Sequence, residues 1–227
     1  MLSAIDQQAL WVTIKLATAT TVILLLLGTP LAWWLAKFKG RLKPLIEALI
    51  ALPLILPPTV LGFYLLIAFS PQNLPGQWFA SLTSQSLAFS FYGILIGSVI
   101  YSLPFVVQPL QNAFSQLGTE FEEAAAVLGA GPLDRFFNLV LPLTQKSFIT
   151  AATLGFAHTV GEFGVVLMIG GNIPGETQVL SIALFDHVEA LEYSEAHTLA
   201  LGLVVFSVIT LTLINSINRK GGSRVIG

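Results

Sequence analysis

Long apolar runs separated by short polar connectors dominate this sequence and constrain its fold more than any other feature. A lipid bilayer has a hydrocarbon core about 30 Å thick, which an α-helix crosses with roughly 20 apolar residues. Helices pair all of their own backbone N–H and C=O groups in a solvent that offers no partners. We therefore expect an all-α, polytopic transmembrane helical bundle of about five to six spans, forming a single domain over residues 1–227. The five segments long enough to span are 12–36, 44–69, 88–114, 148–169 and 197–217.

The composition supports lipid as the solvent for most of the chain. Hydrophobic residues make up 55% of the 227 residues and charged residues only 10%, unlike a soluble domain. The formal net charge of -2, with no long basic run, excludes nucleic acid, whose phosphates require clustered Lys and Arg. The lack of cysteine excludes disulfides, thiolate metal sites and thiol nucleophiles. The N-terminus shows no signal-peptide pattern, so we expect the first apolar segment to be retained.

Basic residues predict the orientation of the chain in the membrane, because Lys and Arg accumulate in cytoplasmic connectors. With five spans, nine of the ten basic residues fall on one side, and only Lys15 falls elsewhere. The outer connector 170–196 carries acidic residues and no Lys or Arg. We therefore predict that the N-terminus lies outside and the C-terminus in the cytoplasm. The nine cytoplasmic residues are Lys37, Lys39, Arg41, Lys43, Arg135, Lys146, Arg219, Lys220 and Arg224.

The cytoplasmic connector 116–146 has the pattern of a helical hairpin. Three consecutive alanines, 124–126, favour a helix with a surface that another protein can approach closely. Gly129 and Gly131 permit a turn, and a second helix is predicted to begin near Leu133. One face of that helix is apolar, so it could bury against a soluble partner or against the chain's own membrane domain. Its residues are Leu133, Phe136, Phe137 and Val140.

The hairpin resembles the EAA motif of binding-protein-dependent ABC importers. The pattern is Glu123-Ala-Ala, Gly129, Leu139 and Leu141-Pro142, with Leu139 where the family usually has Ile, a change that conserves volume. The resemblance implies that residues 118–146 or so form the coupling hairpin, which sits in a cleft of a separate ATPase subunit and transmits its closure. The ATPase-coupling residues that it implies are Glu123, Ala124, Ala125, Gly129, Leu139 and Pro142.

Three further motifs resemble molybdate-transport permeases, and sulfate permeases share a looser version. They are the runs 52–62, 161–164 and 171–177. The resemblance implies the permease subunit of a type I ABC importer in the inner membrane, translocating molybdate or tungstate, with a sulfate or thiosulfate permease as the alternative. It also implies a homodimer with two copies of an ATPase and a periplasmic or extracellular oxyanion-binding protein. This chain is then not an enzyme and binds no cofactor, while ATP-Mg belongs to the partner ATPase.

Prolines and one carboxylate interrupt the apolar segments. Pro53, Pro57, Pro58 and Pro104 remove backbone donors, which predicts either hinges lining a pathway or ordinary tolerance of proline in membrane helices. Glu162 lies well inside an apolar segment, where an ionisable group is costly. A carboxylate lining the path would repel a dianion, so we expect Glu162 to hold a helix or gate contact through backbone donors near Gly161 and Gly164, or to be purely structural. The candidate pathway or gate residues are Gly161, Glu162, Phe163, Gly164, Asn172 and Pro174.

Other functional classes have weaker support in the sequence. An intramembrane metal enzyme could use His158 and Glu162, which share a helix face, but His187 and His197 lie too far out to complete the site. A serine hydrolase is not supported either, because no serine-nucleophile motif occurs. An ion-coupled secondary transporter would usually show internal repeats and several buried charges, and it would not need the hairpin. The outer connector mixes apolar and acidic residues at about 178–195, which predicts a short interfacial or re-entrant helix.

Overall fold

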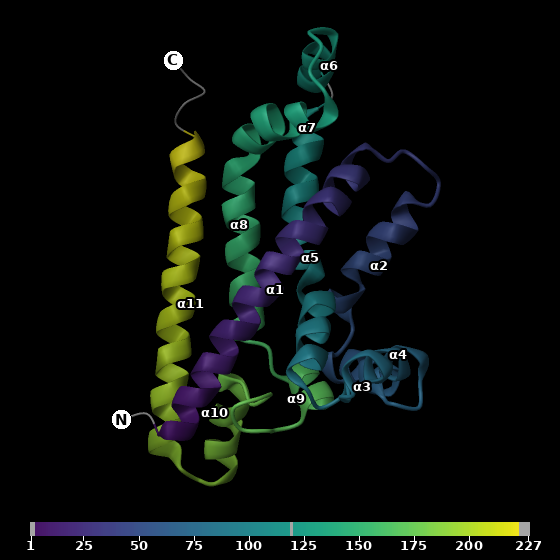
Figure 1. Ribbon diagram of the computed structural model, residues 1–227. Helices are drawn as coiled ribbons and strands as arrows, with labels where there is room; N and C mark the ends of the chain where they lie inside the picture. Colours follow the sequence, from purple (N-terminus) through teal and green to yellow (C-terminus); the bar gives the residue numbers. More distant parts are fainter. Residues whose placement is uncertain (1–2, 119, 223–227) are drawn as a thin grey trace.

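The computed structural model describes residues 3–118 and 120–222, with side chains to residue 216, and this part of the chain is nearly all helical and without strands (Figure 1). The all-α fold is therefore confirmed. The helices are α1 (Ala4–Lys37), α2 (Lys43–Ile55), α3 (Pro58–Phe69), α4 (Leu74–Thr83), α5 (Phe91–Leu117), α6 (Glu120–Val127), α7 (Pro132–Arg135), the π-helical turn η1 (Phe136–Val140), α8 (Leu141–Val160), α9 (Gly164–Gly170), α10 (Leu180–Glu189) and α11 (Tyr193–Gly222).

Helix α1 is the longest element and runs the length of the bundle. It begins with a capping box in which the Ser3 side chain accepts from the Asp6 N–H and the Asp6 carboxylate accepts from the Ser3 N–H. Its 34 residues correspond to about 51 Å at 1.5 Å per residue. Pro30 removes one backbone hydrogen bond, yet the helix is continuous. Along α5 and α8 it buries one apolar core, which includes Leu24, Leu35, Val106, Leu110, Val140 and Ala151.

Two of the five expected spans are broken helices. Helices α2 and α3 meet at 109°, and the segment that ends with α8 meets α9 at 59°, while α1, α5 and α11 are long and apolar enough to span alone. The first break falls at Pro57 and Pro58, which lack the N–H groups that would continue the helix. The segments 44–69 and 148–169 are thus each a bent pair rather than one straight helix. Helices α3 and α9 pack against each other beyond the two breaks.

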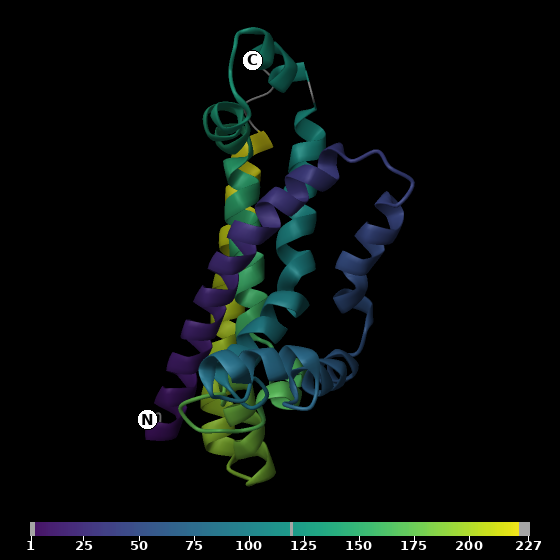
Figure 2. The same cartoon turned by 45° about the vertical axis from the view of Figure 1, so that its right-hand side comes forward.

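The two ends of the bundle differ in structure (Figures 1 and 2). One end carries the hairpin α6–α7 and the C-terminal end of α11, and the other carries the start of α1 together with α3, α4, α9 and α10. Helix α10 confirms the short helix expected in the outer connector, whereas α4 was not expected. Among the basic residues expected in the cytoplasm, Arg224 and the side chains of Arg219 and Lys220 lie outside the described residues.

Candidate functional site

The turn of the hairpin depends on one glycine. Helix α6 ends in a pair of backbone hydrogen bonds, from Gly129 N to Ala126 O and from Ala130 N to Ala125 O, both 3.0 Å long. This pattern closes a helix when the residue after its end adopts a left-handed conformation. Gly129 has φ +89°, which side-chain-bearing residues rarely adopt. The sequence prediction of a turn at Gly129 is confirmed, and the chain then restarts at Pro132.

The tip of the hairpin is apolar and exposed. Val127 and Leu128 have 89% and 88% of their surface exposed, and Leu133 has 73%. Exposed apolar groups gathered in this way are typical of surfaces that contact another protein or a membrane. Beside them on α6, Glu123 and Ala124 are exposed and Ala125 is half-buried, all three being part of the EAA motif.

The apolar face predicted for the second helix is buried in one part and exposed in the other. Val140 is fully buried and Phe136 is half-buried against the bundle, whereas Leu133 and Phe137 are exposed. Packing against the chain's own membrane domain is thus seen for Val140 and Phe136, while burial of Leu133 and Phe137 against a soluble partner stays a prediction. Leu139 is half-buried in η1, and Pro142 is exposed in the first turn of α8. The second helix is also not separate, because η1 leads directly into α8.

A cavity of about 570 Å³ lies where the two broken helices meet. Gly164 at the start of α9 packs on Pro58 at the start of α3, where an added Cβ would lie 2.8 Å from the proline Cβ. Broken helices at membrane depth are tolerated where they are buried in protein or line a cavity. Four of the expected pathway residues line it, namely Gly161, Glu162, Phe163 and Gly164. Thr59, Tyr101 and His158 also belong to the lining.

His158 is oriented by a chain of hydroxyl groups. Thr159 Oγ1 donates to the carbonyl of Gly155 (3.0 Å) and lies 3.0 Å from Ser102 Oγ, which in turn lies 2.9 Å from His158 Nδ1. A hydroxyl chain in which His158 Nδ1 donates to Ser102, Ser102 to Thr159 and Thr159 to Gly155 satisfies every group in it. The ring is stacked on Phe105, with centroids 3.9 Å apart. This leaves Nε2 as the ring nitrogen available to the cavity.

Glu162 occupies the break between α8 and α9. Its side chain is buried, and neither carboxylate oxygen has a hydrogen-bond partner among the described residues. The expected backbone donors do not serve it, since Gly161 N donates to Ala157 O instead. The Ser98 hydroxyl faces the carboxyl group without hydrogen-bond geometry. The main-chain oxygen of Glu162 accepts from Ser181 Oγ, which ties the break to α10.

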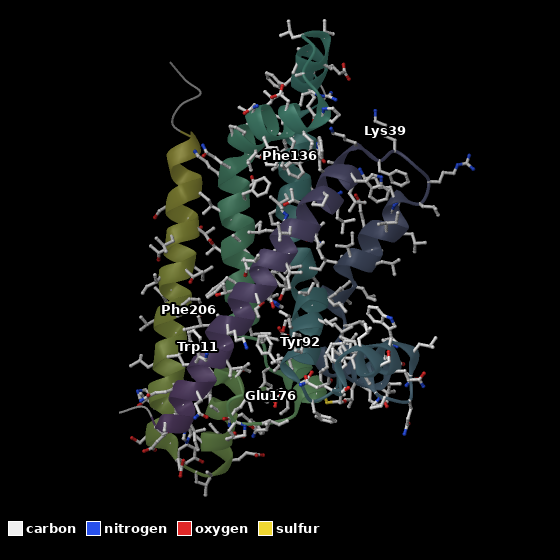
Figure 3. All side chains as sticks on the ribbon, viewed as in Figure 1. Trp11, Lys39, Tyr92, Phe136, Glu176 and Phe206 are labelled. Atoms are coloured by element: carbon white, nitrogen blue, oxygen red, sulfur yellow. The ribbon has the colours of Figure 1, made fainter. Side chains whose placement is uncertain are left out.

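Asn172 and Pro174 lie away from this cavity, at the end of the bundle where α1 begins. The Asn172 amide donates to both carboxylate oxygens of Asp186, at 2.9 and 2.8 Å, and so fixes the loop before α10. Pro174 is exposed and lines a separate hollow beside the start of α1. Glu176 marks that region in Figure 3. The structure thus separates the expected pathway residues into a group at the helix breaks and a group in the loop before α10.

His187 of α10 contacts α1 and the turn before α11, and sequence patterns did not reveal these contacts. Its Nε2 lies 2.9 Å from a carboxylate oxygen of Asp6 in α1, and its Nδ1 lies 2.7 Å from Glu192. The hydrogen bond to Asp6, followed by that to Glu192, raises the pKa of His187 above its usual value. His187 and His158 are therefore each engaged in separate places, and no cluster of three or more metal-ligating side chains occurs among the described residues.

Comparisons with known proteins agree with this architecture. Residues 28–225 match the model of the family described as "Binding-protein-dependent transport system inner membrane component". The chain is 56% identical over 218 residues to the molybdenum transport system permease protein ModB of Azotobacter vinelandii, covering 96% of each. It is 34% identical over 200 residues to the sulfate transport system permease protein CysT of Escherichia coli (strain K12), covering 88% of this chain and 72% of CysT. A chain from the crystal structure of a bacterial alginate ABC transporter, in complex with an alginate pentasaccharide-bound periplasmic protein, has the same fold, with a TM-score of 0.74 at 13% identity over 96% of this chain and 80% of that one.

Proposed function

This chain belongs to the family of binding-protein-dependent transport system inner membrane components, and on that premise we propose that it is the permease subunit of an ATP-driven importer whose substrate is molybdate. The observation that carries the substrate is the 56% identity, across 96% of both chains, to a molybdenum permease. Tungstate has the same tetrahedral shape and charge and belongs to the same proposal.

A sulfate permease is the second candidate. It is supported by the 34% identity to CysT, which covers 88% of this chain. The much higher identity to ModB, over a larger share of both proteins, favours molybdate. An ion-coupled secondary transporter has no support among these relatives.

The proposed mechanism is alternating access. The substrate-loaded binding protein docks on the outer end, where α10 and the loop 171–179 lie, and two ATPase copies bind the hairpins of a permease homodimer. The exposed apolar tip of the hairpin supports this docking, because Val127 and Leu128 are covered by nothing in the described chain. The orientation we propose puts the N-terminus outside and the hairpin in the cytoplasm, as the distribution of Lys and Arg predicts.

The cavity at the helix breaks is the proposed place for a gate. Hinge motion at the breaks near Pro57–Pro58 and Gly161–Glu162 would open or close the space that His158 lines. We propose that Gly161, Glu162, Phe163 and Gly164 act in this gate, and that Asn172 and Pro174 shape the outer mouth.

Uptake of labelled molybdate tests the proposed function. The full chain is reconstituted in proteoliposomes with its ATPase and binding protein, with and without ATP, and with sulfate as competitor. Uptake that requires ATP and persists in excess sulfate supports a molybdate importer. ATP-dependent uptake that sulfate abolishes would move the substrate to sulfate. Uptake independent of ATP would contradict the importer itself.

A further inference from the structure

One carboxylate fastens the hairpin to the rest of the bundle. Glu122 is the only buried residue of α6, with 7% of its surface exposed, whereas its neighbour Glu123 in the EAA motif is exposed. Charged side chains are seldom buried unless they are paired. The partners of Glu122 therefore show where the hairpin is attached to the bundle.

The partners of the Glu122 carboxylate come from the end of α1. Lys37 Nζ forms an ion pair with one carboxylate oxygen, and Trp33 Nε1 lies 3.5 Å from the other. Lys37 Nζ also lies 4.2 Å from the centroid of the Trp33 ring, so the ring positions the cation that holds Glu122.

The second half of the hairpin meets the same point. Arg135 Nη1 in α7 donates to the main-chain oxygen of Glu122 (3.4 Å). Phe136, at the start of η1 and labelled in Figure 3, packs on the Trp33 ring with centroids 5.2 Å apart. The first arm of the hairpin thus contacts the end of α1 through Glu122. The second arm contacts it through Phe136, which packs on Trp33.

The other end of α1 is bound to the outer mouth. Asp6 pairs with His187 of α10, and Thr13 Oγ1 accepts from the main-chain N–H of Leu180 at the start of α10 (2.8 Å). One continuous helix of about 51 Å therefore touches the hairpin at one end and α10 at the other. A rigid element with fixed contacts at both ends can carry a displacement between two distant sites.

We infer that α1 is a strut that couples the hairpin to the outer mouth, and that Glu122 is the positioning residue through which the hairpin holds it. This inference rests on the proposed function, because it assigns the route by which ATPase closure reaches the outer end. Glu123 and the exposed tip face the ATPase in this arrangement, while Glu122 faces α1.

The first test measures substrate taken up per ATP hydrolysed, using the complete complex with its ATPase and binding protein. Glu122→Gln and Lys37→Gln are expected to keep ATP hydrolysis and to lower this ratio about tenfold, equivalent to about 1.4 kcal/mol. The matched control is Glu47→Gln, which removes the charge that pairs with Lys43 within α2. Its side-chain oxygen can still accept from Gln111 of α5, so the ratio should stay unchanged. The double reversal Lys37→Glu with Glu122→Lys should recover most of the ratio that either reversal loses alone. An unchanged ratio in the Gln variants, or a parallel fall of hydrolysis and uptake, would overturn the inference.

A second test does not depend on the identity of the substrate. Since the chain has no cysteine, Val188→Cys in α10 introduces a single exposed site for a spin label. The distance between labels of the two copies is measured with and without a non-hydrolysable ATP analogue. We expect the distance to change in the otherwise unaltered complex and to stay fixed with Glu122→Gln, although the ATPase still copurifies. An equal change in both would refute the strut, whereas a failure of molybdate uptake with this result intact would count only against the proposed substrate.

Discussion

The contact between α3 and α9 leaves no room for a side chain at Gly62. A Cβ added there would lie 2.6 Å from the Cβ of Met168 and 3.3 Å from the Cα of Val165. Ordinary carbon contacts are about 3.5–4.0 Å, so Gly62→Ala must separate the two helices by roughly 1 Å. Neither opposing atom can move by a change of rotamer, because both belong to or adjoin the backbone.

The expected cost follows from two opposing terms. Overpacking of this kind costs about 1–3 kcal/mol, and the better helix propensity of alanine returns up to about 1 kcal/mol. A net loss of about 1.5 kcal/mol corresponds to a fall of roughly 3–6 °C in Tm for a chain of this size. Thermal unfolding of the purified protein in detergent, followed by tryptophan fluorescence, measures it.

Two other glycines provide graded controls. In Gly97→Ala the new Cβ meets Ile169 Cδ1, the far end of a flexible side chain, which can turn away at small cost. In Gly202→Ala it meets nothing within 4 Å, so Tm should stay the same or rise. We therefore expect the highest Tm for Gly202→Ala, a lower one for Gly97→Ala and the lowest for Gly62→Ala. A Gly62→Ala protein as stable as Gly202→Ala would refute the close packing of α3 on α9.

Three further predictions concern single side chains. The pKa of His187 is raised, so its stabilising contacts are complete below its usual pKa of about 6.5 and are lost as the pH rises through the raised value. Tm should therefore fall across that pH range. His187→Gln should make Tm less dependent on pH. Gly129→Leu should lower ATP-driven uptake about 5- to 30-fold with normal membrane insertion, because a left-handed residue other than glycine costs about 1–2 kcal/mol. Gly131→Ala, in open space without a positive φ, should transport normally. Ser102→Ala should lower stability by about 1 kcal/mol in detergent unfolding, since His158 loses its partner; no change would contradict the hydroxyl chain.

Local patterns in the sequence were enough for the five apolar segments and for the turn of the hairpin, but not for α4. Segments of apolar residues longer than a bilayer is thick determine spanning helices, because nothing else satisfies the backbone in lipid. Gly129 was identifiable for a similar reason, since the chain must reverse between two helical segments and glycine allows this. The short helix α10 also followed from its own mixture of apolar and acidic residues.

Directions in space were not readable from those patterns. Pro57 and Pro58 predicted an interruption, but the 109° bend is set by the packing of α3 on α9, in which Gly62 meets residues about a hundred positions later in the chain. The same limit applies to Glu162, whose burial was expected while its lack of donors was not.

The contacts at the two ends of α1 show most clearly which features follow from the sequence and which only from the tertiary structure. Sequence by itself determined the all-α membrane fold, the hairpin and the residues of the EAA motif, because these depend on composition and on spacings of a few residues. Only the tertiary structure decided that Glu122, rather than its neighbour Glu123, is buried against α1, since its partner Lys37 lies 85 positions away. The link between Asp6 and His187 spans 181 positions for the same reason. Such contacts exist only after the helices have packed, and no local periodicity encodes them.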